Sequence, residues 1–285
     1  MKRVGNNMRY ITLFTLIFLM SFTSFANIIE DKEPAILEVH YVKTSVSDTL
    51  KNRNHSDPMV LRIGKTASMF YPPKEMWYDS IRLTDYESYR KIYREVNPPG
   101  SKYTPISGLE SEYLFRNVYD GETRVYRPIA GMRYCYTEPT ESPSWEITSE
   151  SKNILGYDCI LAKCNFRGRQ WNAWFAPDIP VKEGPWKLFG LPGLVLEAND
   201  SKEHYSYKAV GIYTDNLMPV GIKLYVRDTP SKLKSRQVFL QKMYHEYIKG
   251  NFTASMNAMF GKGGNAKPTE SQYDYQERDY PHQSK

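Results

Sequence analysis

Cysteine is scarce in this chain, and long apolar runs are confined to one place. The 285 residues include three cysteines, while 41% are hydrophobic and 25% are charged, an ordinary balance for a globular protein. Beyond the N-terminus no run is long and apolar enough to form a membrane-spanning helix. The basic residues form no stripe that could follow a phosphate backbone, which argues against nucleic-acid binding.

Motifs for catalysis and cofactor binding are also missing. There is no Gly-x-Ser-x-Gly elbow, and no Walker or dinucleotide-binding loop follows an expected strand. His245 and Glu246 begin like a zinc-binding His-Glu-x-x-His helix, but Lys249 stands where the second histidine is needed. Cys159 with a histidine could make a thiol nucleophile, and a buried or disulfide-bonded cysteine is the alternative. We therefore predict no catalytic residue, metal ion or cofactor, and favour a non-enzymatic protein.

The N-terminus has the pattern of a secretory signal peptide. A basic segment precedes an apolar run of about a dozen residues, which is short for a membrane span. Small residues follow at Ser24 and Ala26, the positions that a signal peptidase reads. We predict that residues 1–26 are removed and that the protein is secreted, in the periplasm or associated with the outer membrane. A membrane anchor is the alternative interpretation.

A secreted protein enters an oxidising compartment, where the three cysteines could form one disulfide and leave one thiol free. Cys159 and Cys164 lie five residues apart, so in one extended strand they face opposite sides and should not bond to each other. Two alternatives remain open. Cys135 bonds to one of them, or all three are small buried side chains without a bridge.

Alternating apolar and polar residues, punctuated by turn signals, predict many short strands. The chain has 23 tyrosines, which suit half-buried strands. Turns are expected at Asp120-Gly121, near Gly156 and at Arg167-Gly168. Helical spacing is found only within residues 79–97 and 231–250. We predict a mainly β protein with two helices (α+β) and an antiparallel sheet. Residues 27–250 form its single domain, and residues 251–285 form a flexible polar tail.

One stretch, GPWKLFGLPGLVLEAND at residues 184–200, concentrates glycine, proline and large apolar residues. Glycine and proline force turns here, so neither a plain strand nor a helix fits. One interpretation is a structural corner in which Trp186 and Phe189 plug the end of a sheet. The other is a rigid loop at the mouth of a cavity, shaped for a ligand or partner.

Residues 156–200 resemble the signature of the GLPGLI family of secreted Gram-negative envelope proteins. The residues that carry this resemblance are Gly156, Tyr157, Cys159, Gly168, Gly184, Pro185, Gly190, Leu191, Pro192 and Gly193. Val195 replaces the isoleucine of the family name, a β-branched exchange that keeps strand character. The resemblance implies an envelope location and names no reaction. The pattern is also loosely similar to envelope carriers of the LolA/LolB type, which implies a curved antiparallel sheet or half-barrel around a helix.

These features favour binding of an apolar ligand, a peptide or an outer-membrane partner. The side chains expected to make the contact are Trp171, Trp174, Trp186, Phe189 and Arg169. Trp171 and Trp174 point to opposite faces of one strand, so one of them could line a pocket unless both faces are buried. Arg167 and Arg169 could clamp an anionic group or be exposed hairpin arginines. An accessory factor for an outer-membrane transporter or secretion machine is the alternative function.

Overall fold

The computed structural model describes residues 33–48, 53–99, 111–118, 120–129, 132–221, 230–247 and 276–279. The predicted signal peptide, most of the strand that the pattern of residues 220–228 predicts, the helix end expected at Gly250 and most of the predicted tail lie outside these residues. Among the described residues, no helix has the length and apolar character needed to span a bilayer.

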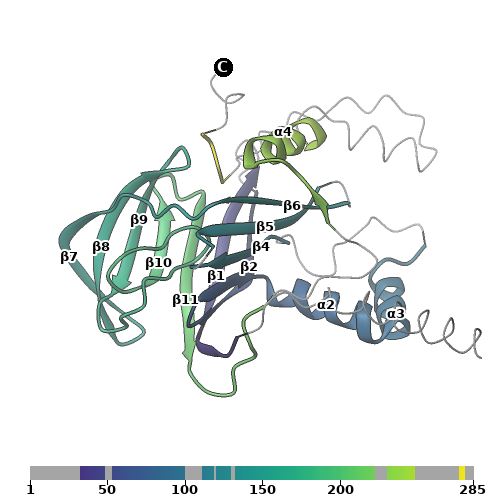
Figure 1. The fold of residues 1–285 in the computed structure, drawn as a ribbon, viewed down its shortest axis with the longest axis horizontal. Helices are drawn as coiled ribbons and strands as arrows, with labels where there is room; N and C mark the ends of the chain where they lie inside the picture. Colours follow the sequence, from purple (N-terminus) through teal and green to yellow (C-terminus); the bar gives the residue numbers. More distant parts are fainter. Residues whose placement is uncertain are drawn as a thin grey trace, which may run out of the picture.

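Twelve strands of the described residues form one open, mixed sheet in the order β12-β6-β5-β4-β3-β2-β1-β11-β10-β9-β8-β7 (Figure 1). The strands are β1 (Ala35–Asp48), β2 (Arg53–Gly64), β3 (Ala67–Tyr71), β4 (Tyr113–Asn117), β5 (Glu122–Ile129), β6 (Met132–Pro139), β7 (Glu146–Ile154), β8 (Tyr157–Phe166), β9 (Arg169–Ala176), β10 (Leu194–Asp200), β11 (Tyr205–Tyr213) and β12 (Ser231–Lys232). Neighbouring strands are antiparallel except β12 and β6, which pair in parallel over two residues. The predicted mainly β character is confirmed, and the short β12 makes the sheet mixed.

The predicted hairpins lie where the turn residues placed them. β4 and β5 pair around Asp120-Gly121, β7 and β8 pair around Gly156, and β8 and β9 pair around Arg167-Gly168. Tight turns between antiparallel strands need few residues, so local sequence is enough to locate them.

The structure describes three helices, so the prediction of two is wrong. They are α2 (Pro73–Thr84), α3 (Tyr86–Val96) and α4 (Arg236–Tyr247). Residues 79–97, predicted as part of one helix, are divided at Asp85, whose backbone leaves helical geometry. The Asp85 side chain accepts a hydrogen bond from the backbone N–H of Ser88, which is the bond of a helix N-cap. Pro73 occupies the first turn of α2, where its missing N–H costs nothing.

The sheet curves, and its concave face holds the main core. In Figure 1, β4, β5 and β6 run across the direction of β1 and β2. Phe70 on β3 makes edge contacts with Tyr41 on β1 and Tyr207 on β11, with ring centroids 6.1 and 5.8 Å apart. The Tyr41 hydroxyl donates to the Val195 carbonyl on β10 over 2.6 Å, reaching past the intervening β11. Both halves of the sheet therefore share one core.

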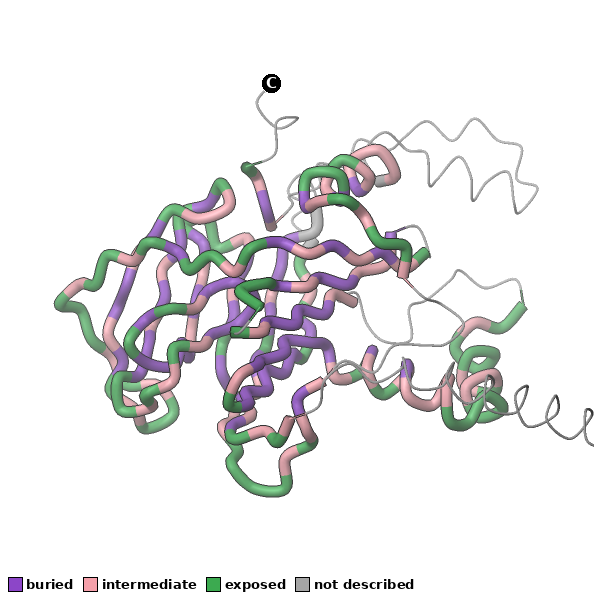
Figure 2. The backbone as a smooth tube through the Cα atoms, viewed as in Figure 1, coloured by how far each residue is buried: buried purple, intermediate pink, exposed green. Residues whose placement is uncertain are grey.

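A second, smaller core lies on the opposite face of β2 to β6. Met69, Phe115 and Tyr126 are buried there, and Met76 of α2 packs against them. Their neighbours Phe70, Leu114 and Val125 belong to the main core, as strand alternation requires. β3 and β4 are thus covered on both faces, and Figure 2 shows them as almost entirely buried. α4 packs on β6, where the rings of Phe239 and Tyr136 lie 5.0 Å apart.

Candidate functional site: a buried ionic cluster on the concave face

The loop between β9 and β10, which carries the signature residues, fills the core. Trp186, Leu188 and Leu191 are almost completely buried. The Trp186 ring lies 5.6 Å from the ring of Trp171 and 6.0 Å from that of Phe166. Rings at these separations pack as part of a hydrophobic interior. The structure therefore gives the loop the plugging role of the corner interpretation.

Two glycines explain why the loop has this composition. Gly190 has a backbone φ of 95°, in the region that residues with side chains avoid. Gly193 lies against β9, so a Cβ atom there would come 2.3 Å from the carbonyl oxygen of Ala176. The first glycine allows the turn and the second allows the chain to return beside β9 as β10.

The structure separates the aromatic side chains that the sequence grouped as a binding surface. Trp171 and Trp186 meet in the core, whereas Trp174 lies half-buried on the other face of β9, with the Lys152 ammonium 4.4 Å from its ring. Phe189 is half-buried, and the Arg116 guanidinium lies 3.9 Å from its ring centroid. Ligand binding by these four side chains stays a prediction.

Lys187 is the residue of this loop with the most unusual surroundings. Its side chain is only 4% exposed, and its Nζ lies 2.5 Å from Glu138 Oε1 on β6 and 2.6 Å from Glu277 Oε1 near the C-terminus. It also donates to the Tyr136 hydroxyl over 3.3 Å. Burial by itself lowers the pKa of Lys187, but the charges of Glu277 and Glu138 outweigh burial and raise it. Lys187 is therefore a buried cation held by two carboxylates.

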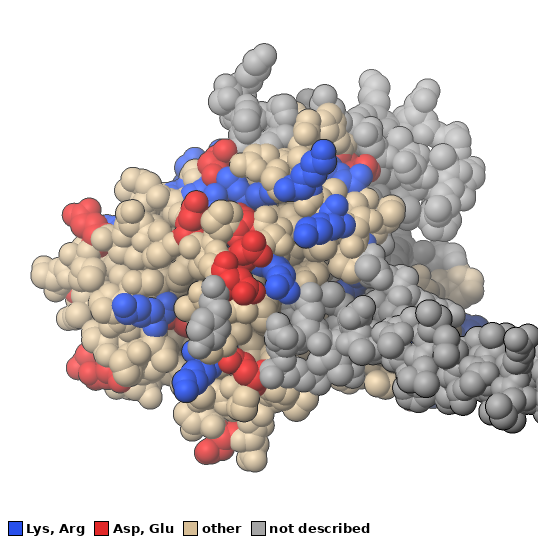
Figure 3. Space-filling model, in the orientation of Figure 1, with Lys and Arg blue, Asp and Glu red and all other residues tan. Residues whose placement is uncertain are grey.

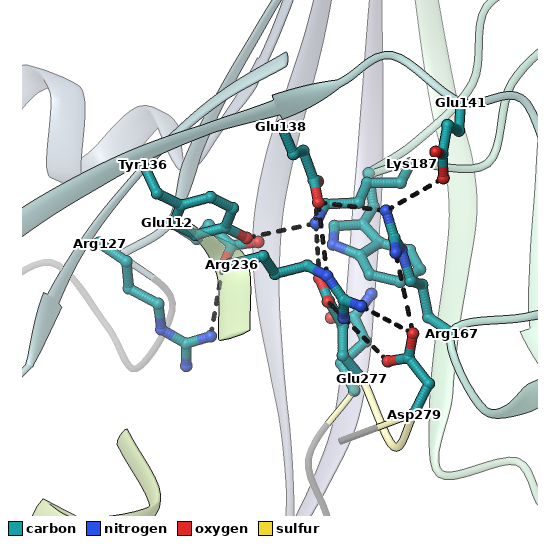
Figure 4. Close-up of polar contacts among 12 residues, drawn as sticks. Glu112, Arg127, Tyr136, Glu138, Glu141, Arg167, Lys187, Arg236, Glu277 and Asp279 are labelled. Carbon is teal, nitrogen blue, oxygen red and sulfur yellow. Dashed lines mark hydrogen bonds and ion pairs between the residues drawn. The ribbon is translucent and has the colours of Figure 1, made fainter. Parts of the chain in front are cut away.

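Arg236, at the start of α4, binds the same C-terminal segment (Figure 4). Its guanidinium donates to Glu277 Oε2 over 2.5 Å and to both oxygens of Asp279 over 2.8 Å. Two parallel bonds from one guanidinium to one carboxylate are the strong, directional form of this contact. Burial tends to raise the pKa of Glu277, but Lys187 and Arg236 overcome it and hold the pKa below its usual value.

The hairpin arginines complete the cluster. The Arg169 side chain is 2% exposed, pairs with Asp200 over 2.8 Å and donates to the Gln276 carbonyl over 2.9 Å. Arg167 lies 3.1 Å from Glu138 and 3.8 Å from Asp279, and its carbonyl accepts from the Arg278 N–H over 2.8 Å. The interpretation of exposed hairpin arginines is therefore wrong, because both side chains turn inward to carboxylates.

We call Lys187, Arg236, Arg167 and Arg169, with Glu138 and Asp200, the Lys187 site. Residues 276–279 lie in it without helix or strand structure, and Glu277 is buried there. These four residues belong to the segment predicted as a flexible tail, whose other residues lie outside the described ones. Sequence reasoning selected Arg169 and missed Lys187 and Glu277. The one available signal was a single lysine inside the apolar run from Trp186 to Phe189.

A serine, a histidine and an aspartate also meet near the end of the β1–β2 hairpin. Ser45 Oγ lies 3.0 Å from His55 Nε2, and Asp57 Oδ2 lies 3.5 Å from the same nitrogen. A catalytic triad needs the serine and the carboxylate on different ring nitrogens, so that one orients the ring while the other exchanges a proton. This arrangement therefore lacks the geometry of a hydrolase triad.

All three cysteines are free thiols, as in the interpretation without a bridge, but only Cys159 and Cys164 are buried and Cys135 is partly exposed. Burial raises the pKa of Cys159 to about 11 and that of Cys164 to about 12. A thiol with such a pKa is protonated at neutral pH and is a poor nucleophile, since the thiolate is the reactive form. The burial of Cys159 thus disfavours a role for its thiol as a catalytic nucleophile.

A second ionic cluster attaches α2 to the outer face of the sheet. Asp79 accepts a hydrogen bond from the Tyr113 hydroxyl over 2.6 Å and forms an ion pair with Arg133, which also lies 3.2 Å from Glu75. Burial raises the pKa of Asp79 to about 6, with Glu75 adding to the rise and Arg133 opposing it. A carboxyl group with this pKa changes its charge in mildly acidic solution.

We predict that the Asp79 contribution to stability falls as the pH rises from about 4 to about 6. In this range the folded state holds a proton on Asp79 that the unfolded state has already released, so raising the pH favours unfolding. Relative to Asp79→Asn, the wild-type free energy of unfolding should fall by at most about 3 kcal/mol across this range. Urea denaturation at several pH values measures it. Asp178→Asn, at an exposed position, keeps Asp79 and should lose stability over this range as the wild type does. A wild-type stability that rises with pH relative to Asp79→Asn would contradict the prediction.

On the face shown in Figure 3, Lys and Arg side chains gather along the upper edge, and Asp and Glu side chains lie among and below them. Among the described residues, the buried Lys187 site joins more ion pairs into one network than any other cluster of charged side chains.

Comparison with solved structures finds two crystal forms of PNGF-II, "Structure of PNGF-II in P21 space group" and "Structure of PNGF-II in C2 space group". The first has 15% sequence identity and a TM-score of 0.44, and the match covers 74% of this chain and 33% of that one. The second has 14% identity and a TM-score of 0.44, covering 73% and 32%. The chain thus spans about a third of the length of these structures.

No curated protein matches the chain. A family model described as "Protein of unknown function (Porph_ging)" matches residues 166–197. These residues include the Arg167-Gly168 turn, β9 and the loop that carries Lys187. The resemblance to the GLPGLI family is therefore confirmed over the segment that builds half of the Lys187 site, and the family is one of unknown function.

Proposed function

We propose that this protein is a non-enzymatic binding protein of the cell envelope, secreted or periplasmic, that holds a peptide segment of a partner in the Lys187 site. The envelope location rests on the signal peptide predicted for residues 1–26. The binding role rests on one observation, namely that a short segment with no regular secondary structure is held there by buried side chains.

The contacts to that segment are those of peptide recognition. Arg169 donates to a main-chain carbonyl of the segment at Gln276, and the Arg167 carbonyl accepts a main-chain N–H at Arg278. Lys187 and Arg236 bind the Glu277 carboxylate between them. Main-chain bonds give affinity for any peptide, and charged side-chain contacts select its sequence. The site therefore supports binding of an acidic peptide.

Two other versions of a binding function receive less support. An apolar ligand held by a curved sheet of the LolA/LolB type would need aromatic side chains open to it, whereas Trp171 and Trp186 pack against each other. An accessory factor for an outer-membrane transporter or secretion machine is compatible with the same site, because the peptide could belong to that machine.

A peptide-binding experiment tests the proposal. The full chain with Glu277→Gln and Asp279→Asn keeps the Lys187 site and weakens its hold on residues 276–279. We expect this variant to bind a labelled peptide of residues 271–285 saturably, with a Kd below about 0.1 mM, a tenth of the effective concentration, on the order of millimolar, at which a tethered segment acts. Fluorescence anisotropy measures it. Adding Arg236→Gln should weaken binding at least about tenfold, since it removes charge-assisted bonds to both carboxylates.

The control keeps the change in net charge but moves it away from the site. Glu122→Gln with Asp178→Asn alters two exposed positions, so residues 276–279 stay in place and the added peptide should bind more weakly than to the tail variant. Circular dichroism checks that every variant is folded. Absence of peptide binding to the folded tail variant would overturn the proposed function.

A further inference from the structure

We infer that the Lys187 site is specific for an extended segment with two carboxylates two residues apart, Glu-x-Asp, and that residues 276–279 are a built-in competitor that a partner segment must displace. This inference rests on the proposed function and adds the chemistry of the ligand and the regulation of the site. The partner is a protein segment that carries this acidic pair.

The spacing of the ligand follows from two carboxylate positions in the site. The inner one lies between Lys187 and Arg236, which contact Glu277 at 2.6 and 2.5 Å. The outer one is formed by Arg236, which contacts Asp279 at 2.8 Å, with Arg167 at 3.8 Å. In an extended chain, residues i and i+2 project to the same side. One peptide therefore fills both positions only when a single residue separates its acidic side chains.

Residues 276–279 can act as a competitor because every cation of the Lys187 site also contacts a carboxylate outside this segment. Lys187 contacts Glu138 at 2.5 Å, and Arg236 and Arg167 lie 3.5 and 3.1 Å from the same residue. Arg169 is paired with Asp200. When residues 276–279 leave, no cation of the site loses all of its carboxylate contacts. Glu138 alone then faces Lys187, Arg236 and Arg167, so each pairing is weaker, but no cation is isolated and the site remains formed for another peptide.

The burial of the segment gives it an outer end from which displacement can begin. The side chain of Glu277 is 9% exposed, whereas that of Asp279 is 32% exposed. An incoming peptide can take the outer carboxylate position on Arg236 first and the inner one afterwards.

The charge balance of the site favours an acidic ligand. The four cations of the site face two buried acids of its own, Glu138 and Asp200, so the site attracts a segment that brings two more negative charges.

A tethered segment competes at an effective concentration that is on the order of millimolar for short flexible linkers. The wild-type chain should therefore bind an added Glu-x-Asp peptide at least about tenfold more weakly than the Glu277→Gln, Asp279→Asn variant does, because only a fraction of its sites is open. The exposed-site control, Glu122→Gln with Asp178→Asn, should bind like wild type.

The closing experiment compares labelled peptides of residues 271–285 on these full-length proteins by fluorescence anisotropy. One peptide keeps Glu-Arg-Asp, one carries Gln-Arg-Asn, and one has the order Glu-Asp-Arg with adjacent acids. We expect the first to bind the tail variant at least about tenfold more tightly than either of the others. Sedimentation velocity of the wild-type chain should show a monomer, as a competitor acting within one chain requires.

The outcomes separate this inference from the function on which it rests. Equal binding of all three peptides to the tail variant, or equal affinity of wild type and tail variant, would overturn the inference and leave peptide binding in place. A wild-type dimer that the tail substitutions dissolve would assign the segment to a second copy and also overturn the competitor role. No binding of any peptide would overturn both the inference and the proposed function.

Discussion

Replacing Lys187 with methionine is expected to lower the free energy of unfolding by about 3–5 kcal/mol, since it removes the cation from two buried ion pairs. Lys187 contacts Glu138 at 2.5 Å and Glu277 at 2.6 Å, and both carboxylates are more than nine-tenths buried. Methionine fills a similar volume, so the loss is electrostatic rather than a cavity effect. Urea denaturation followed by tryptophan fluorescence measures the change.

Two further variants isolate the cause. Lys182→Met lies in the same loop with an exposed side chain and should change the unfolding free energy by no more than about 0.5 kcal/mol. Adding Glu277→Gln to Lys187→Met removes one of the two carboxylates that lost the lysine and should recover part of the loss. If the two lysine variants are equally stable, the buried ion pairs do not hold the loop in place.

Replacing Trp186 with alanine is expected to cost about 3–5 kcal/mol, the range for removing a large buried ring. The ring packs on Trp171 and Phe166 in the centre of the main core. The substitution also opens a cavity beside Lys187, whose ammonium lies 5.6 Å from the Trp186 ring centroid. Thermal or urea unfolding measures the loss.

Trp77→Ala is the matched control, because the Trp77 side chain is 52% exposed and its removal should cost no more than about 0.5 kcal/mol. Trp186 also has a φ of 56°, where glycine is less strained than alanine. Trp186→Gly should therefore be no less stable than Trp186→Ala. If loss of Trp186 costs as little as loss of Trp77, the loop is not a core element.

Much of the sheet could be predicted because its information is local. The alternation in residues 169–176 placed Trp171 and Trp174 on opposite faces of one strand, and the structure has them there, with Trp171 buried and Trp174 half-buried. The helix break at Asp85 was missed because Asp85 can cap a helix or stand inside one, and only the Ser88 contact shows which. The two-residue β12 has no local signal, since its pairing with β6 depends on where α4 packs.

The Lys187 site could be predicted only in part. Arg169 was selected as a possible anion clamp, and its spacing from Arg167 across Gly168 is visible in the sequence. Its partners Asp200 and Gln276 are 31 and 107 residues away along the chain. Glu277 lies in a polar segment whose composition is typical of a flexible tail. Composition reports the average behaviour of a segment and carries no information about a specific buried partner.

The sequence by itself determined the mainly β class, the turns between successive strands and the GLPGLI signature, because periodicity, turn chemistry and a contiguous motif all act over a few residues. Only the tertiary structure decided that the signature loop plugs a core, that its lysine is a buried cation and that residues 276–279 bind there. Curvature of the sheet brings β6, β9, α4 and the C-terminal segment to one place. Charges so distant in sequence can pair only after the chain has closed around them, where low solvent exposure makes each pairing strong.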